Sequence, residues 1–124
     1  MAEHDKDLAV EYFLELDGTV HFVDEECKYR VEIKAKRTHV TPERPHGLSY
    51  SLTLHNKKNE RILGFDNAHP VPANKGPSGK KHKFHDHKHR YERTRIYKFE
   101  DTGTLISDFY ASVEQVMKDR GVKI

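Results

Sequence analysis

Alternation of apolar and polar residues in two segments constrains the fold of this chain most strongly. In residues 29–36 and again in residues 48–55, every second side chain is apolar. Successive side chains of a β-strand point to opposite faces, so this period of two predicts strands with one buried and one solvent-facing side. The apolar positions are Tyr29, Val31, Ile33 and Ala35 in the first segment and Leu48, Tyr50, Leu52 and Leu54 in the second. A sheet is therefore favoured over a helical fold.

Further strands are predicted on both sides of these two. Near the N-terminus, Val10 to Leu16 and Thr19 to Val23 flank the dipeptide Asp17-Gly18, which favours a tight hairpin turn. Residues 62–65 predict a fifth short strand, and residues 90–99 again look extended. We expect an antiparallel sheet of five or six strands.

The last part of the chain changes its period. Apolar residues recur at three- and four-residue spacing between Leu105 and Met117, which predicts an amphipathic helix. Thr102 or Thr104 can cap the start of this helix and Gly121 can end it, which gives a helix over residues 104–120. The predicted class is α+β, with one domain over residues 1–124 and the C-terminal helix packed on one face of the sheet.

Residues 66–81 show no apolar periodicity. They contain three prolines and two glycines, which predicts a long loop between the strands on either side. Long loops inside compact domains tend to be functional or mobile. We therefore look for functional residues at the ends of this segment.

The compartment is inferred from hydropathy and cysteine content. No apolar run approaches the roughly 20 residues that cross a bilayer, and the N-terminus lacks the profile of a signal peptide. Cys27 is the single cysteine, so no internal disulfide can form. We expect a soluble, cytoplasmic protein without membrane association, in which Cys27 is a small core residue rather than a nucleophile.

Charge is distributed unevenly along the chain, although the net charge is only +2. Residues 1–26 carry nine acids and one lysine, whereas residues 73–98 carry nine lysines and arginines and two acids. A basic stretch of this density attracts a polyanion, and the acidic start can pair with it or keep the fold soluble.

A row of histidines lies inside the basic stretch. If the chain is extended from Phe84 onward, His85, His87 and His89 point to one face. Three interpretations remain open: a metal site, a catalytic site for RNA cleavage, and a solvated basic hairpin whose lysines protect a sheet edge. Against a metal site, neighbours two apart on a strand lie about 6–7 Å apart, which is wide for one shared tetrahedral ion.

For catalysis, the residue types fit a reaction that needs no metal. A histidine can remove a proton from a ribose 2′-hydroxyl or donate one to the leaving 5′-oxygen, while lysine and arginine stabilise the phosphate. Cationic neighbours also lower the pKa of a histidine, which keeps a general base available. Asp66 and Asn67 form either a turn or part of the site, because they end a strand and face the long loop.

Other polar and aromatic residues are assigned more ordinary places. Tyr91 and Tyr97 can stack on bases, but strand spacing favours packing against the C-terminal helix. The scattered histidines are expected at the surface or in loops; they are His39, His46, His55 and His69.

The order of motifs in the second half resembles the TumE-type toxins of prokaryotic toxin–antitoxin pairs. The chain has RILGFDN, a loop with proline and histidine, the cluster HKFHDHKH, then IYKFED and LISDFYASVEQV. These are similar to the family's G-Y-D-N motif, its K/H-H-x-H cluster, its tyrosine-arginine-phenylalanine strand and a helix with the pattern IxDFxxDVE. The resemblance covers about residues 60–118.

The resemblance implies a growth-inhibiting toxin that is neutralised by an antitoxin, usually one with a helix-turn-helix DNA-binding domain. It places Asp66 and Asn67 on the D-N motif, and it implies packing rather than chemistry for Asp108 and Phe109. The histidine cluster falls on His85, His87 and His89, with Lys83 or Lys88 as its basic neighbour.

The leading hypothesis is a metal-independent ribonuclease without a cofactor. His85, His87 or His89 act as general base and acid, and Asp66 orients an imidazole. The residues expected to bind the RNA substrate are Asn67, Lys83, Lys88, Arg90 and Arg93. The alternatives are a non-catalytic module that binds nucleic acid or the antitoxin, a magnesium nuclease built on Asp66 and Asp86, and a histidine-rich metal carrier.

Overall fold

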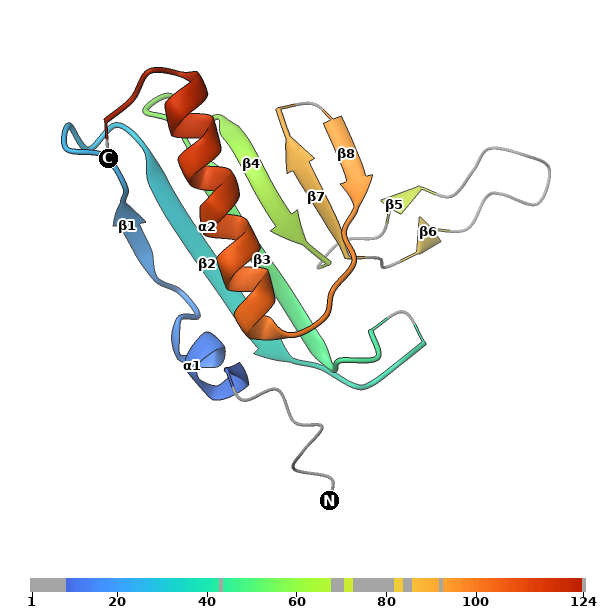
Figure 1. The fold of residues 1–124 in the computed structure, drawn as a ribbon. Coiled ribbons are helices and arrows are strands. Elements are labelled where there is room, and N and C mark those ends of the chain that lie inside the picture. The colour runs from blue at the N-terminus through green and yellow to red at the C-terminus, as the bar shows by residue number, and fades with distance from the viewer. Residues whose placement is uncertain are drawn as a thin grey trace.

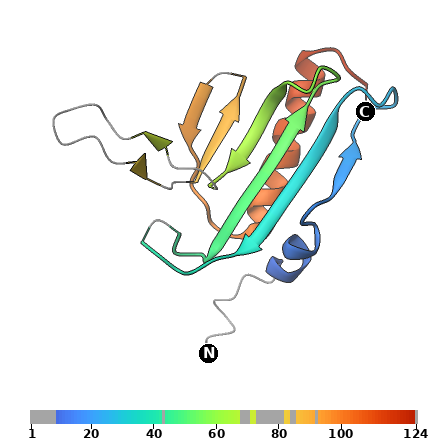
Figure 2. The same ribbon diagram turned by 180° about the vertical axis from the view of Figure 1, so that it is seen from behind.

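A computed structural model of the chain describes residues 9–42, 44–67, 71–72, 82–83, 86–91 and 93–123. Its main element is a six-stranded antiparallel sheet with the order β1-β2-β3-β4-β7-β8. Helix α2 lies across one face of this sheet, and the opposite face is turned toward the viewer in Figure 2 (Figures 1 and 2). The sheet strands are β1 (Val20–Phe22), β2 (Arg30–Arg37), β3 (Leu48–His55), β4 (Arg61–Asp66), β7 (His87–Arg90) and β8 (Arg93–Ile96). The predicted α+β class is confirmed.

The two alternating segments form the centre of the sheet, as predicted. Strands β2 and β3 pair so that Ile33 lies opposite Leu52 and Val31 opposite Leu54. Directly opposed residues of antiparallel strands share a face, so these apolar side chains gather on the side that α2 covers. All four are buried.

Helix α2 spans Thr102–Asp119 and closes the core. Its buried apolar residues are Leu105, Phe109, Val113, Val116 and Met117. The predicted cap is wrong, because Asp101 is the N-cap residue and accepts a 2.7 Å hydrogen bond from the backbone N–H of Thr104. Gly121, just beyond the helix, has a φ of +69° and so takes the left-handed conformation typical of a helix end.

The predicted opening hairpin is wrong in its first half. Residues Val10–Glu15 form a short helix, α1, and not a strand. Phe13 is fully buried within the core, because α1 packs near the N-terminal start of α2. The turn at Asp17-Gly18 does form, but it joins α1 to the sheet: Asp17 Oδ1 accepts a hydrogen bond from the backbone N–H of Ala35.

Other expectations need smaller corrections. Cys27 is exposed in the turn between β1 and β2, with a φ of +55°, so it is not a core residue. The segment 90–99, expected to be extended, is interrupted at Tyr91. This residue has a φ of +56° and lies in the turn that connects β7 to β8. Within the predicted loop 66–81, Val71–Pro72 form a short strand, β5, which pairs with β6 (His82–Lys83) just after the loop. Within the described residues, the structure contains no helix that is both long and apolar enough to span a membrane.

Candidate functional site

The pairing of β4 with β7 brings the ends of the long loop together. Asp66, the last residue of β4, lies directly opposite His87, and Gly64 lies opposite His89. Cross-strand partners share a face, and residues two apart on a strand do so as well. Asp66, His87 and His89 therefore meet on the face of the sheet away from α2. We call these three residues the Asp66 cluster.

Within the Asp66 cluster, each carboxylate oxygen has one imidazole beside it. His87 Nε2 lies 3.0 Å from Asp66 Oδ1, and His89 Nε2 lies 3.1 Å from Asp66 Oδ2. The two imidazole rings are nearly perpendicular, with centroids 4.5 Å apart. The side chains are 4% exposed for Asp66, 5% for His87 and 13% for His89, so His89 is the most accessible member.

Thr94 and Arg61 contact the cluster from outside it. Thr94, opposite His89 on β8, has its Oγ1 2.9 Å from His89 Nδ1, so both ring nitrogens of His89 have a polar neighbour. Arg61 Nη1 lies 3.9 Å from Asp66 Oδ2. The Arg61 side chain crosses Gly64, where an added Cβ would lie 3.3 Å from Arg61 Cδ. Glycine at this position therefore leaves room for the guanidinium to approach the carboxylate.

The surroundings of His89 favour its neutral form. Burial lowers the pKa of His89, and the Arg61 guanidinium lowers it further, although Asp66 acts in the opposite direction. A neutral imidazole carries one N–H donor and one bare nitrogen acceptor. His89 can therefore donate from one nitrogen and accept at the other between Asp66 and Thr94.

Each residue of the Asp66 cluster offers an atom that can bind a metal ion. One ligand atom from each of its three residues lies within 4.8 Å of the other two. Asp66 Oδ1 is buried and accepts no hydrogen bond from the described part of the chain, even though His87 Nε2 is near. The strand spacing that counts against a shared ion does not apply here. The His87 and His89 rings converge, with centroids 4.5 Å apart, and the third ligand, Asp66, comes from the neighbouring strand β4.

Two of the predicted phosphate-binding residues, Lys88 and Arg90, lie on the other side of the sheet. Lys88 Nζ is 5.8 Å from the centroid of the Phe65 ring, and Phe65 packs edge-to-face on Phe109 of α2. Arg90 forms an ion pair with Asp119 at the end of α2. Of the other expected residues, His85 lies outside the described residues, and Lys83 is described only as part of β6.

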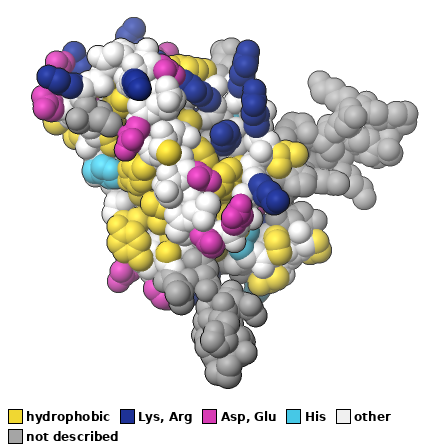
Figure 3. Space-filling view, in the orientation of Figure 1, with side chains coloured by type: hydrophobic (Ala, Val, Ile, Leu, Met, Phe, Trp, Pro, Cys, Tyr) yellow, Lys and Arg dark blue, Asp and Glu magenta, His cyan; other side chains and the backbone are white. Residues whose placement is uncertain are grey.

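These cations form a continuous surface with their neighbours on β8. Lys88, Arg90, Arg93 and Arg95 line a pocket of about 260 Å³, and we call this set the basic surface. Figure 3 shows Lys and Arg side chains gathered over β7 and β8, beside α2. The structure thus separates the histidines from the lysine and arginines of the same hairpin.

Asn67 follows Asp66 but has a different environment. It is fully buried, and its side-chain Oδ1 accepts a 2.9 Å hydrogen bond from the backbone N–H of Tyr50. Its Nδ2 donates a 2.8 Å bond to the carbonyl of Leu48. The Asn67 amide therefore fixes the end of β4 against β3, which positions Asp66.

A second polar group was not found from the sequence. Asp86 Oδ2 accepts a 2.6 Å hydrogen bond from the Tyr50 hydroxyl and lies 3.0 Å from His46 Nε2. The backbone N–H of Leu48 donates to His46 Nδ1, so the proton of a neutral His46 sits on Nε2 and points at Asp86. Burial and the Asp86 carboxylate raise the pKa of Tyr50. His46, expected at the surface or in a loop, is in a loop but only 10% exposed at its side chain.

No periodic pattern pointed to this group, because His46 and Asp86 lie outside the strands. The Asp86 carboxylate contacts the Tyr50 hydroxyl and the His46 imidazole and is not part of the Asp66 cluster.

The family comparison agrees with the resemblance in the motifs. A family model described as Toxin TumE matches residues 3–117. The chain belongs to the TumE toxin family. Searches of curated proteins and of solved structures returned no match. The match extends beyond the motif region into the first half of the chain, so α1 and the first strands belong to the family fold. The protein is thus a toxin of a toxin–antitoxin system and has a cognate antitoxin as its partner.

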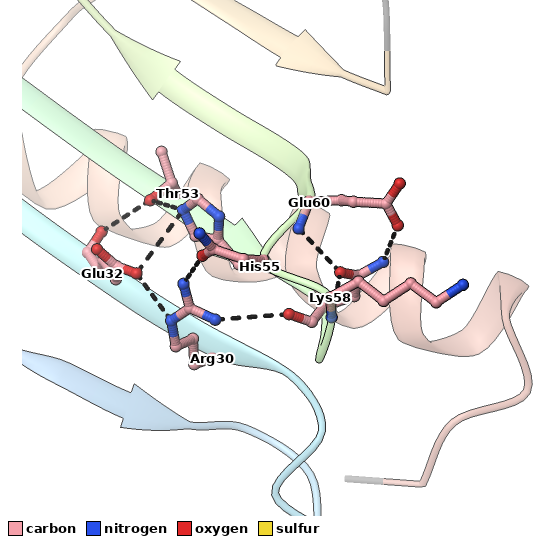
Figure 4. Close-up of polar contacts among 8 residues, drawn as sticks. Arg30, Glu32, Thr53, His55, Lys58 and Glu60 are labelled. Carbon is pink, nitrogen blue, oxygen red and sulfur yellow. Dashed lines mark hydrogen bonds and ion pairs between the residues drawn. The ribbon is translucent and has the colours of Figure 1, made fainter.

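The face that carries the Asp66 cluster in this toxin continues as a polar surface across β3 and β2. His55 Nε2 lies 2.9 Å from Thr53 Oγ1 and 3.9 Å from Glu32, and Glu32 accepts a 2.8 Å hydrogen bond from Arg30 (Figure 4). Burial lowers the pKa of His55. Neither of the helices in the described part of the chain lies over this face of the sheet (Figure 2).

Proposed function

We propose that this toxin arrests growth by cleaving RNA, and that the Asp66 cluster is its catalytic centre, working by histidine acid–base chemistry without a metal. The observation that carries the proposal is the single carboxylate with one imidazole beside each oxygen. A carboxylate next to an imidazole fixes the orientation of the ring and stabilises it when it takes a proton. RNA is a cytoplasmic target, so we place the action there.

In this mechanism, one imidazole removes the proton of a ribose 2′-hydroxyl. The 2′-oxygen then attacks the phosphorus, the bond from phosphorus to the 5′-oxygen breaks, and a protonated imidazole donates its proton to that oxygen. The products are a 2′,3′-cyclic phosphate and a 5′-hydroxyl. His87 and His89 share the roles of base and acid, with His85 as the further candidate from the motif, and Asp66 aligns the rings.

Among the described residues, Arg61 is a cation beside the cluster, because its Nη1 lies 3.9 Å from Asp66 Oδ2. We assign to Arg61 the stabilisation of charge on the phosphoryl oxygens, because Lys88 and Arg90 lie on the other face of β7. The basic surface binds the RNA backbone away from the scissile bond, and Lys83 is a further candidate for this binding from its place in the sequence motif. Asn67 contributes by holding Asp66 in place rather than by touching RNA.

The proposal is tested with tag-free protein and a defined RNA in EDTA. Wild-type protein should produce fragments with cyclic phosphate ends, and His87→Ala and His89→Ala should lose activity by a factor of about 10² or more, as expected for removal of an acid or base. His39→Ala is the matched control, because it removes an exposed imidazole that is not part of the Asp66 cluster. Cleavage that survives both cluster substitutions would refute the assignment.

A second function, a non-catalytic binding module, is favoured by one observation. The Asp66 cluster is largely buried, whereas Arg90, Arg93 and Arg95 of the basic surface are exposed. Intact RNA after long incubation, together with tight binding that weakens steeply with salt, would support this module, because phosphate contacts release counterions. Charge reversal at Arg93 and Arg95 should then abolish binding, while substitutions in the cluster leave it unchanged.

A further inference from the structure

We propose that Asp66, His87 and His89 form a binding site for a divalent transition-metal ion of the zinc type. The binding itself is independent of the proposed RNA cleavage. Its consequence for activity rests on that proposed function, because the same nitrogens would serve the metal and the proton transfer.

The arrangement of the ligand atoms fits a tetrahedral ion. For bonds of about 2.0–2.1 Å to nitrogen and oxygen, neighbouring ligands of a tetrahedral zinc ion lie roughly 3.3 Å apart. Here the two nitrogen–oxygen separations are 3.0 and 3.1 Å, and all three ligand atoms lie within 4.8 Å of one another. The two short separations involve different oxygens of Asp66, so the imidazoles have to rotate toward one of these oxygens to bring all three ligand atoms to about 3.3 Å from one another. Three protein ligands leave a fourth position for water, as in open zinc sites.

The hydrogen bonding of Asp66 also supports a bound metal ion. Its Oδ1 is buried and accepts no hydrogen bond from the described part of the chain, although His87 Nε2 is 3.0 Å away. A buried carboxylate oxygen without a donor is costly, since burial removes water and nothing replaces it. An ion between Oδ1 and the two Nε2 atoms would satisfy this oxygen.

The contacts around the cluster suit ligating histidines. A metal-bound imidazole usually donates its other N–H to a nearby oxygen, which fixes the ring. Thr94 Oγ1 lies 2.9 Å from His89 Nδ1 and can accept that bond when Nε2 binds the ion. The ligands stand on paired strands, β4 and β7, so the backbone fixes their spacing.

The ligand types select the class of ion. Two imidazoles and one carboxylate suit zinc, copper or nickel, whereas magnesium prefers oxygen ligands and retains its water. Arg61 opposes the ion, because its guanidinium lies 3.9 Å from Asp66 Oδ2. Its side chain is 41% exposed, so it can turn toward solvent when the ion enters.

Metal binding would switch off the metal-free reaction. An imidazole nitrogen that binds zinc has no lone pair with which to accept a proton, so His87 and His89 cannot act as base and acid in the loaded protein. Zinc is therefore an inhibitor of the proposed cleavage.

The test is a calorimetric titration of tag-free, chelator-treated toxin with zinc, followed by cobalt as a spectroscopic probe. We expect one ion per chain and a visible cobalt spectrum of tetrahedral type. Asp66→Asn, His87→Ala and His89→Ala should each weaken zinc binding by at least tenfold. His39→Ala is the matched control and should leave it unchanged. Arg61→Gln should strengthen binding by roughly tenfold, because it removes a nearby positive charge.

Each contrary outcome has a separate meaning. Zinc binding that is unchanged in the three cluster variants would show capture by other histidines and overturn the site, as would no binding at all. Folding of each variant is checked by circular dichroism, and the gain in Arg61→Gln cannot come from unfolding. Zinc binding by a toxin that never cleaves RNA would refute the proposed function and leave the site standing. Cleavage that zinc does not inhibit would refute the link between the two.

Discussion

Two tyrosine hydroxyls of the toxin allow a matched test of what burial adds to a hydrogen bond. Tyr50 donates to Asp86 at 2.6 Å and Tyr97 donates to Asp108 at 2.6 Å. The chemical groups and distances are the same, but Tyr50 is buried in the core and the Tyr97 bond is exposed. The substitutions Tyr50→Phe and Tyr97→Phe each remove one hydroxyl and keep the ring.

The expected costs differ because water can replace only the exposed partner. A hydrogen bond to a charged group contributes roughly 1.5–3 kcal/mol to stability, and Asp86 keeps His46 as a partner after the substitution. We therefore expect Tyr50→Phe to lower the free energy of unfolding by about 2 kcal/mol, and Tyr97→Phe by less than about 1 kcal/mol. The Tyr50→Phe substitution keeps the ring, so the edge-to-face contact with Phe13 is the same in the wild type and in this variant.

The assay is urea unfolding followed by circular dichroism. With an m value of roughly 2 kcal/mol/M, the midpoint of Tyr50→Phe should fall by about 1 M and that of Tyr97→Phe by less than half as much. Equal shifts in the two variants, or a larger shift for Tyr97→Phe, would show that burial adds nothing to the stabilisation by the Tyr50–Asp86 hydrogen bond.

Three further predictions concern the core, the helix cap and the pH dependence. Phe109→Ala should cost about 3–5 kcal/mol by leaving a cavity under α2, measured by the same unfolding assay, and a cost below about 1 kcal/mol would contradict the packing. Asp101→Ala should lower the melting temperature and Asp101→Ser should largely restore it, because serine can still accept from the N–H of Thr104. Since burial lowers the pKa of His55 below its ordinary 6.5, the unfolded chain takes up the proton first, so stability should fall as the pH drops below about 6.5. His55→Asn should reduce that fall between pH 7.5 and 5.5, and an unchanged pH profile would exclude this contribution.

The elements predicted from the sequence are those whose signal is local. The alternation in β2 and β3 and the spacing of the apolar residues in α2 depend only on which faces are buried, so both were predicted. The segment Val10–Leu16 was assigned wrongly because its apolar residues fit two periods. Val10, Phe13 and Leu14 have helical spacing, and the turn signal at Asp17-Gly18 outweighed it.

The candidate site was predicted only in part, for a related reason. Alternation places His87 and His89 on one face, and the same rule places Lys88 and Arg90 on the other, which separates the imidazoles from the phosphate-binding residues expected beside them. The contact between Asp66 and His87, which are 21 positions apart, depends on the pairing of β4 with β7, and no local pattern specifies that register. The Asp86 group depends equally on distant pairings, and His46 gave no signal in its loop.

The pairing of β4 with β7 also determines when the Asp66 cluster can assemble during synthesis of the chain. Asp66 emerges from the ribosome well before His87, and the two meet only after the intervening segment has closed, which carries an entropic cost. A nascent or truncated chain that ends before residue 87 therefore contains no assembled cluster. The cluster therefore assembles only after β7 has been synthesised and has paired with β4.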